Sequence, residues 1–329
     1  MNDLASRTTR CLLSFLQMDL RQLSALVAIA DHGSFSSAAR ALYTVQSNVS
    51  GHISRLEKEL GVTLVDRHRG GLTDDGGQVV ERARRILREM DDISADMASR
   101  GDAVSGDARI GVIGTTARWL MPQLLPALAE QHPLVHVTVF EGSSTTLLPR
   151  LMAGHLDAAV VHLPVDDPEL TVEPLFAEDL IIIVHSRHPW AQEDELSLQR
   201  VASEQLLIPP KGTAMRRILD KAAAASGVTL RAQAEIDGVR LLTSLAMEGF
   251  GPAIVPSTAV PGWVKGDFKR VLVPELPRRV IGWVQRRRPT PGAPTRAVHQ
   301  STREILGTRG ALQRGVHVGS EAFPLGKNG

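Results

Sequence analysis

The spacing of apolar residues divides the chain into an N-terminal helical part and a longer part in which strands and helices alternate. In residues 20–29 the apolar side chains recur mostly three or four positions apart, which predicts a helix that ends near Gly33. Ser34 predicts the start of a second helix over residues 35–42, because its hydroxyl can accept a hydrogen bond from a free amide of the first turn.

A third helix is predicted after Thr44, because apolar residues there step by four, four, three and four positions. These residues are Val45, Val49, Ile53, Leu56 and Leu60. The opposite face holds side chains that donate or accept hydrogen bonds without a negative charge, namely Gln46, Ser47, Asn48, Ser50, His52 and Arg55. Such a face suits a DNA groove, and Gly61 predicts the end of the helix.

A short hairpin with a basic tip is predicted next, from residues 62–65 and 72–73 around Arg67 and Arg69. Thr73 or Asp74 can cap a long amphipathic helix whose apolar residues run to Ile93. A solitary helix with so much apolar surface needs a partner, so we expect it to pair with its counterpart in a second copy.

A linker rich in glycine and serine follows at residues 100–106, and beyond it predicted strands and helices alternate. This alternation predicts parallel sheets with right-handed crossovers, arranged as two α/β lobes with a cleft between them. The first unit is predicted to comprise residues 108–112, 120–131, 135–140, 146–153 and 158–162. The second is predicted to comprise residues 180–184, 205–208, 215–226, 233–236, 239–247 and 253–255, with 280–284 returning to it. From residue 307 the sequence lacks periodicity and predicts a disordered tail.

Composition and charge narrow the class of protein only modestly. The chain has 43% hydrophobic and 22% charged residues, as soluble globular proteins do, and its formal net charge of +1 is no sign of a nucleic-acid partner. The one cysteine, Cys11, fits a reducing cytoplasm, and the sequence indicates no metal site and no cofactor. The apolar run of residues 11–16 is too short to span a membrane, so residues 1–17 are interpreted as an N-terminal extension.

The predicted helices two and three form a helix-turn-helix, whose second helix enters the major groove of double-stranded DNA by its N-terminal end. Residues nearest the base edges would be Gln46, Ser47, Asn48 and His52. Residues placed to contact phosphate and to fix the register would be Ser34, Ser50, Arg55, Arg67 and Arg69.

The same region resembles the N-terminal winged helix-turn-helix of the LysR family of bacterial transcription regulators, in order and without gaps. The matching residues are Leu20-Arg21-Gln22-Leu23, Gly33-Ser34-Phe35-Ser36-Ser37-Ala38-Ala39, Leu42, Gln46, Ser50, Leu56-Glu57, Leu60-Gly61, Leu64, Arg67 and Leu72-Thr73. A looser resemblance reaches about residue 290 through Gly249-Phe250-Gly251 and Ile254-Val255-Pro256. The resemblance to the LysR family as a whole implies a regulator that acts as a homodimer or homotetramer and responds to a small-molecule effector.

The domain organisation expected from these patterns combines a winged helix-turn-helix, a long linker helix and an α/β effector domain of two lobes, like that of periplasmic binding proteins. The expected boundaries are 18–76 for the DNA-binding domain, 77–106 for the linker helix and hinge, 107–290 for the effector domain and 307–329 for the tail.

The sequence departs from the family pattern around the recognition helix. Ser47 stands where the family usually has proline, and Val45 where serine or threonine is common, so we expect Thr44 to act as the cap. Gly51 stands where many members have a basic or long polar residue, at a cost of about 1 kcal/mol in helix propensity relative to alanine.

In the family the effector lies between the two lobes, beside residues that follow the strands. The positions that match are Thr115, Thr116, Ser143, Ser144, Gly212 and Thr213. Hydroxyls and free amides at strand ends and helix starts suit an anionic group, and Arg118, Lys211 and Arg216 are candidates for the countercharge. We therefore expect a small carboxylate or another small anion.

Two other classes of function were weighed, an α/β enzyme and a solute-binding protein fused to a DNA-binding module. The chain has no G-x-x-x-x-G-K-[ST], H-E-x-x-H or G-x-S-x-G motif, and its histidines lack metal-ligand spacing. We therefore predict no catalytic residues, and the N-terminal module together with the absence of a secretion signal argues against a solute carrier.

Overall fold

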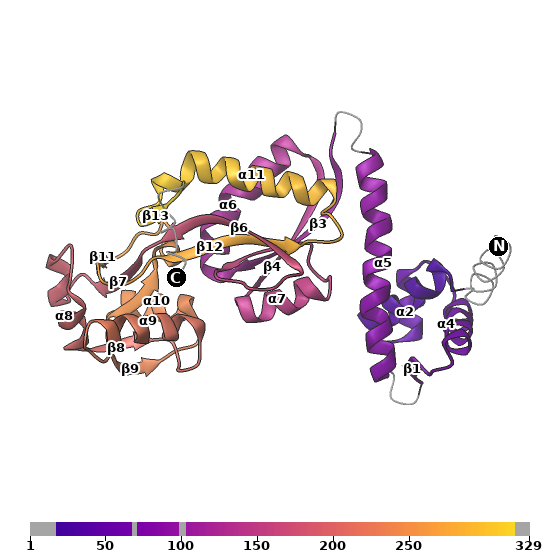
Figure 1. The fold of residues 1–329 in the computed structure, drawn as a ribbon, viewed down its shortest axis with the longest axis horizontal. Helices are drawn as coiled ribbons and strands as arrows, with labels where there is room; N and C mark the ends of the chain where they lie inside the picture. Colours follow the sequence, from indigo (N-terminus) through magenta and orange to yellow (C-terminus); the bar gives the residue numbers. More distant parts are fainter. Residues whose placement is uncertain (1–17, 68–70, 99–102, 320–329) are drawn as a thin grey trace, which may run out of the picture. The chain divides into compact units, whose positions relative to one another are not determined.

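The computed structural model describes residues 18–67, 71–98 and 103–319. They form two compact units, one with the N-terminal helices and most of the linker helix, the other with the α/β lobes (Figure 1). The predicted extension 1–17 and the hairpin tip with Arg69 lie outside the described residues. In the described parts of the chain, no helix is long and apolar enough to cross a membrane.

The first unit is a winged helix-turn-helix followed by a long helix. Its elements are α2 (Leu20–His32), α3 (Phe35–Ala41), α4 (Gln46–Leu60), β1 (Val65–Asp66), β2 (Gly71–Leu72) and α5 (Asp74–Ala98). Asp19 and Gln22 form a capping box that starts α2, and Gly33 ends it in the left-handed conformation with φ 71°. The core joins α2, α4 and the wing through the fully buried Leu26, Ile53 and Leu64.

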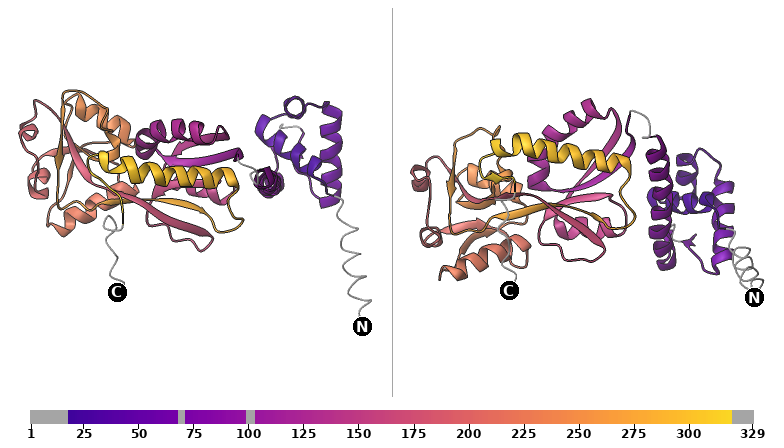
Figure 2. Two further views of the ribbon diagram at one scale, coloured as in Figure 1. Left: turned by 90° about the horizontal axis from the view of Figure 1, so that it is seen from above. Right: turned by 45° about the horizontal axis from the view of Figure 1, so that its top comes forward.

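The second unit contains two lobes, each built around its own sheet. Lobe I comprises β3 (Ser105–Ile113), α6 (Gly114–Gln131), β4 (Leu134–Gly142), α7 (Ser144–Met152), β5 (Ala158–His162), β6 (Leu170–Glu178), β12 (Arg279–Arg286), α11 (Ala293–Arg309), η3 (Gly310–Leu312) and β13 (Val316–His317). Its strand order is β13-β6-β12-β5-β3-β4. Helices α6 and α11 cover one face of this sheet and α7 the other (Figures 1 and 2).

Lobe II has a five-stranded sheet in the order β11-β7-β10-β8-β9. Its elements are β7 (Leu180–His185), η1 (Pro189–Gln192), α8 (Leu198–Ala202), β8 (Gln205–Ile208), α9 (Ala214–Ala225), β9 (Arg231–Glu235), α10 (Val239–Met247), β10 (Ala253–Pro256), η2 (Ser257–Ala259) and β11 (Phe268–Leu272). The five apolar residues that open β7 are all buried, as expected of a strand covered on both faces. Asp179 alone separates β6 from β7, so this segment joins the lobes.

Three predictions about the α/β part were wrong. The sheets are mixed rather than parallel, because β12 is antiparallel to β5 and β6, and β7 is antiparallel to β10 and β11. Residues 280–284 belong to β12 of lobe I, not to the second unit. The effector domain extends beyond residue 290, and residues 307–319 are folded rather than disordered, because α11 packs on lobe I and β13 pairs with β6. Local periodicity could not reveal that the chain returns to lobe I after lobe II.

Candidate DNA-binding face and effector region

The exposed face of α4 carries the side chains predicted to read DNA. Val49, Ile53 and Leu56 are fully buried beneath it. The predicted residues on the other side are exposed or half-buried, namely Gln46, Ser47, Asn48, Ser50, His52 and Arg55. The helix therefore presents one polar face, as the apolar period predicted.

The start of α4 differs from the prediction in two respects. Val45 is the N-cap residue and is 59% exposed, so it is not part of the buried stripe. Thr44 does not cap the backbone, and its Oγ1 accepts a hydrogen bond of 3.0 Å from Nδ2 of Asn48. The side chain of residue 45 has no polar atom to cap the helix, and Thr44 lies one position too early.

Side-chain hydrogen bonds hold several residues around this face in place. Oγ of Ser36 donates to Oε1 of Gln46 at 2.8 Å, and Arg55 donates to the carbonyl of Gly51 at 3.2 Å and lies 3.1 Å from Nδ1 of His52. Ser34 caps α3 by accepting from the amide of Ser37 at 3.1 Å, as predicted. The hydrogen bond between Ser36 and Gln46 was not predicted from the sequence. The position of Ser36 in the first turn of α3, close to the start of the next helix, was the available signal.

Glu57 of α4 holds the wing in place. Its Oε1 accepts hydrogen bonds from the amides of Leu64 and Val65 at 2.8 and 3.1 Å. Arg67 at the end of β1 donates to Oγ of Ser54 at 2.8 Å and lies over the ring of Phe35. Arg67 is thus directed toward the helix-turn-helix, which keeps a cation beside the candidate DNA-binding face.

Thr115 and Thr116 follow β3 as predicted, but they lie in the first turn of α6 and are buried. Thr115 is 6% exposed, and its Oγ1 accepts a hydrogen bond of 2.9 Å from Nη2 of Arg279. Thr116 is fully buried, and its Oγ1 has no hydrogen-bond partner among the residues that the structure describes. The helix begins at Gly114, directly after the strand, and not after a turn.

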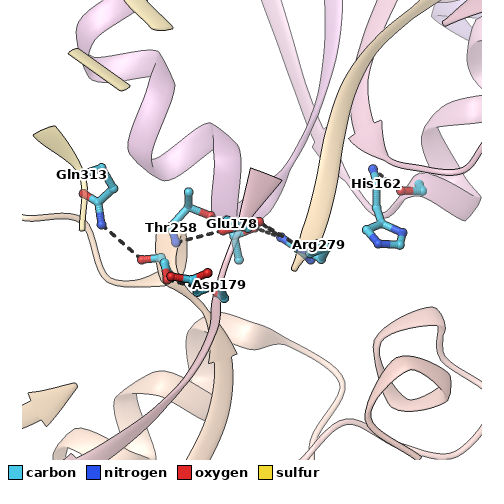
Figure 3. A network of polar contacts seen from close by, with 9 residues as sticks. His162, Glu178, Asp179, Thr258, Arg279 and Gln313 are labelled. Atoms are coloured by element: carbon cyan, nitrogen blue, oxygen red, sulfur yellow. Dashed lines mark hydrogen bonds and ion pairs between the residues drawn. The ribbon is translucent and has the colours of Figure 1, made fainter. Parts of the chain in front are cut away.

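A buried ion pair between Glu178 and Arg279 lies where β6 and β12 pair, and Arg279 also contacts Thr115 (Figure 3). Arg279 donates to Oε1 of Glu178 through Nε at 3.0 Å and Nη2 at 2.6 Å, while Oε2 of Glu178 accepts the amide and hydroxyl of Thr258 at 3.0 and 2.7 Å. We call Thr115, Glu178, Thr258 and Arg279 the lobe-junction network. It joins residues of lobe I to η2 of lobe II, and it was missed because its members are far apart in the sequence.

The C-terminal residues reinforce the same junction. Nε2 of Gln313 donates to the carbonyls of Ser257 and Val260, both at 3.3 Å, and its Oε1 accepts the amide of Gly262 at 3.0 Å. His317 lies 2.9 Å from Oδ1 of Asp179, the residue between β6 and β7. Residues from the predicted tail therefore help to hold the two lobes together.

The remaining effector candidates lie at the ends of β4 and β8. Oγ of Ser144 accepts the amide of His162 at 3.2 Å, which brings β5 to this site, and Ser143 bonds to Thr146 in the first turn of α7. Burial, together with the positive charge of Arg279, lowers the pKa of His162 to about 4. In lobe II, Thr213 caps α9 by accepting the amide of Arg216 at 3.2 Å, and Gly212 precedes it with φ 87°.

Two of the three predicted countercharges, Arg118 and Arg216, are already engaged within the protein, whereas Lys211 is exposed. Arg216 is 5% exposed and binds Asp220 and Glu235, both at 2.8 Å; burial opposes its charge, but these hydrogen bonds outweigh it and raise the pKa of Arg216. Arg118 donates to the carbonyl of Ala259 at 3.3 Å and lies over the ring of Trp263. Lys211 and the starts of α6, α7 and α9 are positive features near the candidates.

A cavity of about 580 Å³ lies between α6, β4 and α10, large enough for a small organic molecule. Its lining includes Met121 and Val139 of lobe I and Arg240 of lobe II, and Arg240 pairs with Glu141 across it. None of the six effector candidates lines it.

Comparisons with known proteins match both units. The model of the LysR substrate binding domain matches residues 101–307, and that of the bacterial regulatory helix-turn-helix protein, lysR family, matches residues 20–77. The DNA-binding transcriptional dual regulator OxyR of Escherichia coli (strain K12) is 31% identical over 303 residues, covering 89% of this chain and 96% of that protein. The hydrogen peroxide-inducible genes activator of Dickeya chrysanthemi is 32% identical over 294 residues, covering 86% and 93%.

Solved structures agree on the fold. A full-length cysteine-to-aspartate variant of OxyR from Pseudomonas aeruginosa superposes with a TM-score of 0.71 at 23% identity, covering 88% of this chain and 95% of that one. Full-length CbnR complexed with its target DNA superposes with a TM-score of 0.65 at 23% identity, covering 87% and 99%. The chain therefore belongs to the LysR family of DNA-binding transcription regulators with an effector-binding domain.

Proposed function

We propose that this regulator recognises its operator with the exposed face of α4 and changes its activity when a small anion binds between the lobes. The observation that carries the first part is the polar N-terminal turn of α4, where the amide side chains of Gln46 and Asn48 are exposed. Gln and Asn amides can read base edges in the major groove, together with Ser47 and His52. Ser34, Ser50, Arg55, Arg67 and Arg69 are assigned to phosphate.

DNA-binding measurements on single variants can distinguish residues that read bases from residues that contact phosphate. Operators are selected from random DNA with the full-length protein, and affinities are then measured for preferred and scrambled duplexes at several salt concentrations. Gln46→Ala should reduce the preference among sequences, whereas Arg55→Ala should weaken binding to all of them and reduce the salt slope by about 1. Equal losses on every duplex for Gln46→Ala would show that Gln46 does not read bases.

We propose a small carboxylate or another small anion as the effector, bound near the six candidates. This rests on the N-termini of α6 and α7, which begin where β3 and β4 end, and of α9, which follows β8 after a short loop, because helix N-termini attract negative charge. Calorimetry of the full chain with a panel of organic acids and matched neutral compounds tests it. Ser144→Ala and Thr213→Ala should weaken binding, whereas Val139→Ala in the cavity should not; binding of neutral compounds alone would contradict the proposal.

We further propose that the response is reversible binding and not oxidation of a thiol. The relatives from Escherichia coli and Dickeya chrysanthemi include proteins named for hydrogen peroxide, but the only cysteine of this chain, Cys11, precedes α2. Peroxide acts on exposed thiolates in preference to other side chains. DNA binding of the wild type and of Cys11→Ser should be unchanged by brief, dilute peroxide, and a loss seen only in the wild type would contradict this.

A homo-oligomer is proposed to assemble through α5, in a cytoplasmic protein that meets its DNA there. The apolar residues Ile86, Met90, Ile93 and Met97 lie four, three and four positions apart and are 43–61% exposed. An exposed apolar stripe of this length fits a second copy of the helix. Ile86→Glu with Met90→Glu should dissociate the oligomer in sedimentation experiments and weaken DNA binding together, and a fully DNA-competent monomer would contradict the interface.

A further inference from the structure

Ser36 and Gln46 connect the two helices of the helix-turn-helix at the end that faces DNA. Ser36 lies in the first turn of α3 and Gln46 is the first residue of α4, and Oγ of Ser36 donates to Oε1 of Gln46 at 2.8 Å. Ala38 and Ala39, which are 0% and 4% exposed, allow the two helices to approach closely. Both polar side chains remain exposed to solvent.

This hydrogen bond matters because the two ends of a carboxamide differ. The oxygen accepts hydrogen bonds, whereas the nitrogen donates two, and rotation of the amide by half a turn exchanges them. With Oε1 held by Ser36, the oxygen end faces α3. Among the residues that the structure describes, no hydrogen bond occupies Nε2 of Gln46, so its donors stay available.

We propose that Ser36 is a positioning residue that fixes the direction of the Gln46 amide, so that Nε2 donates to an acceptor on the major-groove edge of a purine. The purine N7 atom is such an acceptor in both adenine and guanine. This inference rests on the proposed base-reading role of Gln46.

The neighbouring amide supports the idea that side chains here are set in direction before DNA binds. Nδ2 of Asn48 donates to Oγ1 of Thr44, which leaves the oxygen of Asn48 as its free acceptor. The Gln46 amide is thus held through its oxygen and the Asn48 amide through its nitrogen, so Nε2 of Gln46 and Oδ1 of Asn48 are the ends without a partner among the described residues. A purely structural role for Ser36 would instead affect all DNA sequences equally.

The experiment replaces purines in the selected operator, one at a time, with 7-deazapurines, which lack the N7 acceptor but still pair normally. For the wild-type full-length protein, one substitution should weaken binding about tenfold, the effect of losing one good base contact. Gln46→Ala should be insensitive at that position. In Ser36→Ala the amide is free to turn, so the penalty should fall to about threefold or less.

Matched variants separate positioning from folding. Ser37→Ala removes a hydroxyl from the same turn of α3, one that accepts from Arg40 and does not contact Gln46, so it should keep the wild-type penalty. Ser36→Thr restores a hydroxyl and should restore the penalty. Thermal melting of each variant checks that the domain is folded.

The outcomes distinguish this inference from the function on which it rests. If Gln46→Ala keeps the wild-type pattern at every purine, base reading by Gln46 is wrong. If Gln46→Ala loses the pattern but Ser36→Ala keeps it, base reading stands and positioning by Ser36 is overturned. If Ser36→Ala weakens every duplex equally and keeps the full penalty, Ser36 contacts phosphate and positioning is again overturned.

Discussion

At the start of α4, Gln46, Ser47 and Asn48 are exposed, whereas at the lobe junction Glu178 is fully buried and Arg279 is 8% exposed. In the first region water supplies the hydrogen bonds that the protein does not, so these side chains stay available to a partner at little cost in the free energy of folding. In the second region the charged groups must satisfy each other, because leaving one of them buried without its partner is expensive. The proposed DNA-binding face and the lobe junction therefore place opposite requirements on their polar side chains: exposure in the first and mutual pairing in the second.

The largest effect is expected from breaking the buried ion pair. Glu178→Ala leaves the Arg279 guanidinium buried without its carboxylate and should lower the free energy of unfolding by about 3–5 kcal/mol. Glu141→Ala breaks the exposed Arg240–Glu141 pair, whose side chains are 62% and 43% exposed, and should cost at most about 1 kcal/mol. Denaturant titration of the full chain measures both.

A double variant makes the test of this pair stricter. Adding Arg279→Leu to Glu178→Ala removes the stranded charge and should recover part of the lost stability, because apolar replacements of buried pairs are often nearly neutral. Equal losses for the buried and exposed pairs would remove the distinction between the two regions.

Acid sensitivity should also arise at His162 on β5, whose imidazole feels the charge of Arg279 in the lobe-junction network. The pKa of His162 falls from 6.5 to about 4 on folding. Between these two pH values His162 is protonated in the unfolded chain but neutral in the folded chain. Stability is therefore lost as the pH falls through this window, by at most about 2 kcal/mol at pH 5, since the side chain is partly open to solvent.

Replacing the imidazole tests this assignment. His162→Gln should flatten the decline in stability between pH 6.5 and 4, measured by denaturant titration at several pH values. Ser144→Ala removes a hydroxyl that accepts a hydrogen bond from the backbone amide of His162, not from its imidazole. This variant should therefore keep the wild-type slope. An unchanged slope in His162→Gln would assign the acid sensitivity to other groups.

A smaller effect is expected where Gln313 contacts the junction. Gln313→Ala removes hydrogen bonds to Ser257, Val260 and Gly262 and should cost about 1–2 kcal/mol. Hydrogen exchange should accelerate at the amide of Gly262, while amides of α4 keep their rates. Faster exchange throughout both units would show global destabilisation and not a local role at the junction.

The sequence predicted the buried and exposed sides of α4 because the signals for them are local. The period of Val49, Ile53 and Leu56 identifies the buried side of α4, and Ser34 and Gly61 mark helix ends through their own backbone chemistry. The lobe-junction network gave no such signal, because Thr115 and Arg279 are brought together only when the chain returns to lobe I. Charge alone could not show that Glu178 would be the partner of Arg279, since most carboxylates lie on the surface.

The smallest effect is expected at Tyr43, in the turn between α3 and α4. Among the described residues it is the only non-glycine with a positive φ, 51°, and its side chain is 98% exposed. The left-handed conformation costs an ordinary residue about 1–2 kcal/mol, and glycine avoids that cost but loses more freedom on folding. Tyr43→Gly should therefore raise the stability of the DNA-binding unit by about 0.5–1 kcal/mol, whereas Tyr43→Ala should not.

Thermal melting of the two variants measures this difference, and operator affinity shows what it means for the DNA-binding face. The exposed ring contributes nothing to the core, so a gain in stability for Tyr43→Gly with unchanged affinity would mean that the turn only connects the helices. A gain in stability accompanied by weaker binding would mean that the ring contacts DNA and that the strained conformation is retained for that contact. Lower stability in Tyr43→Gly would show that backbone freedom outweighs strain even in this exposed turn.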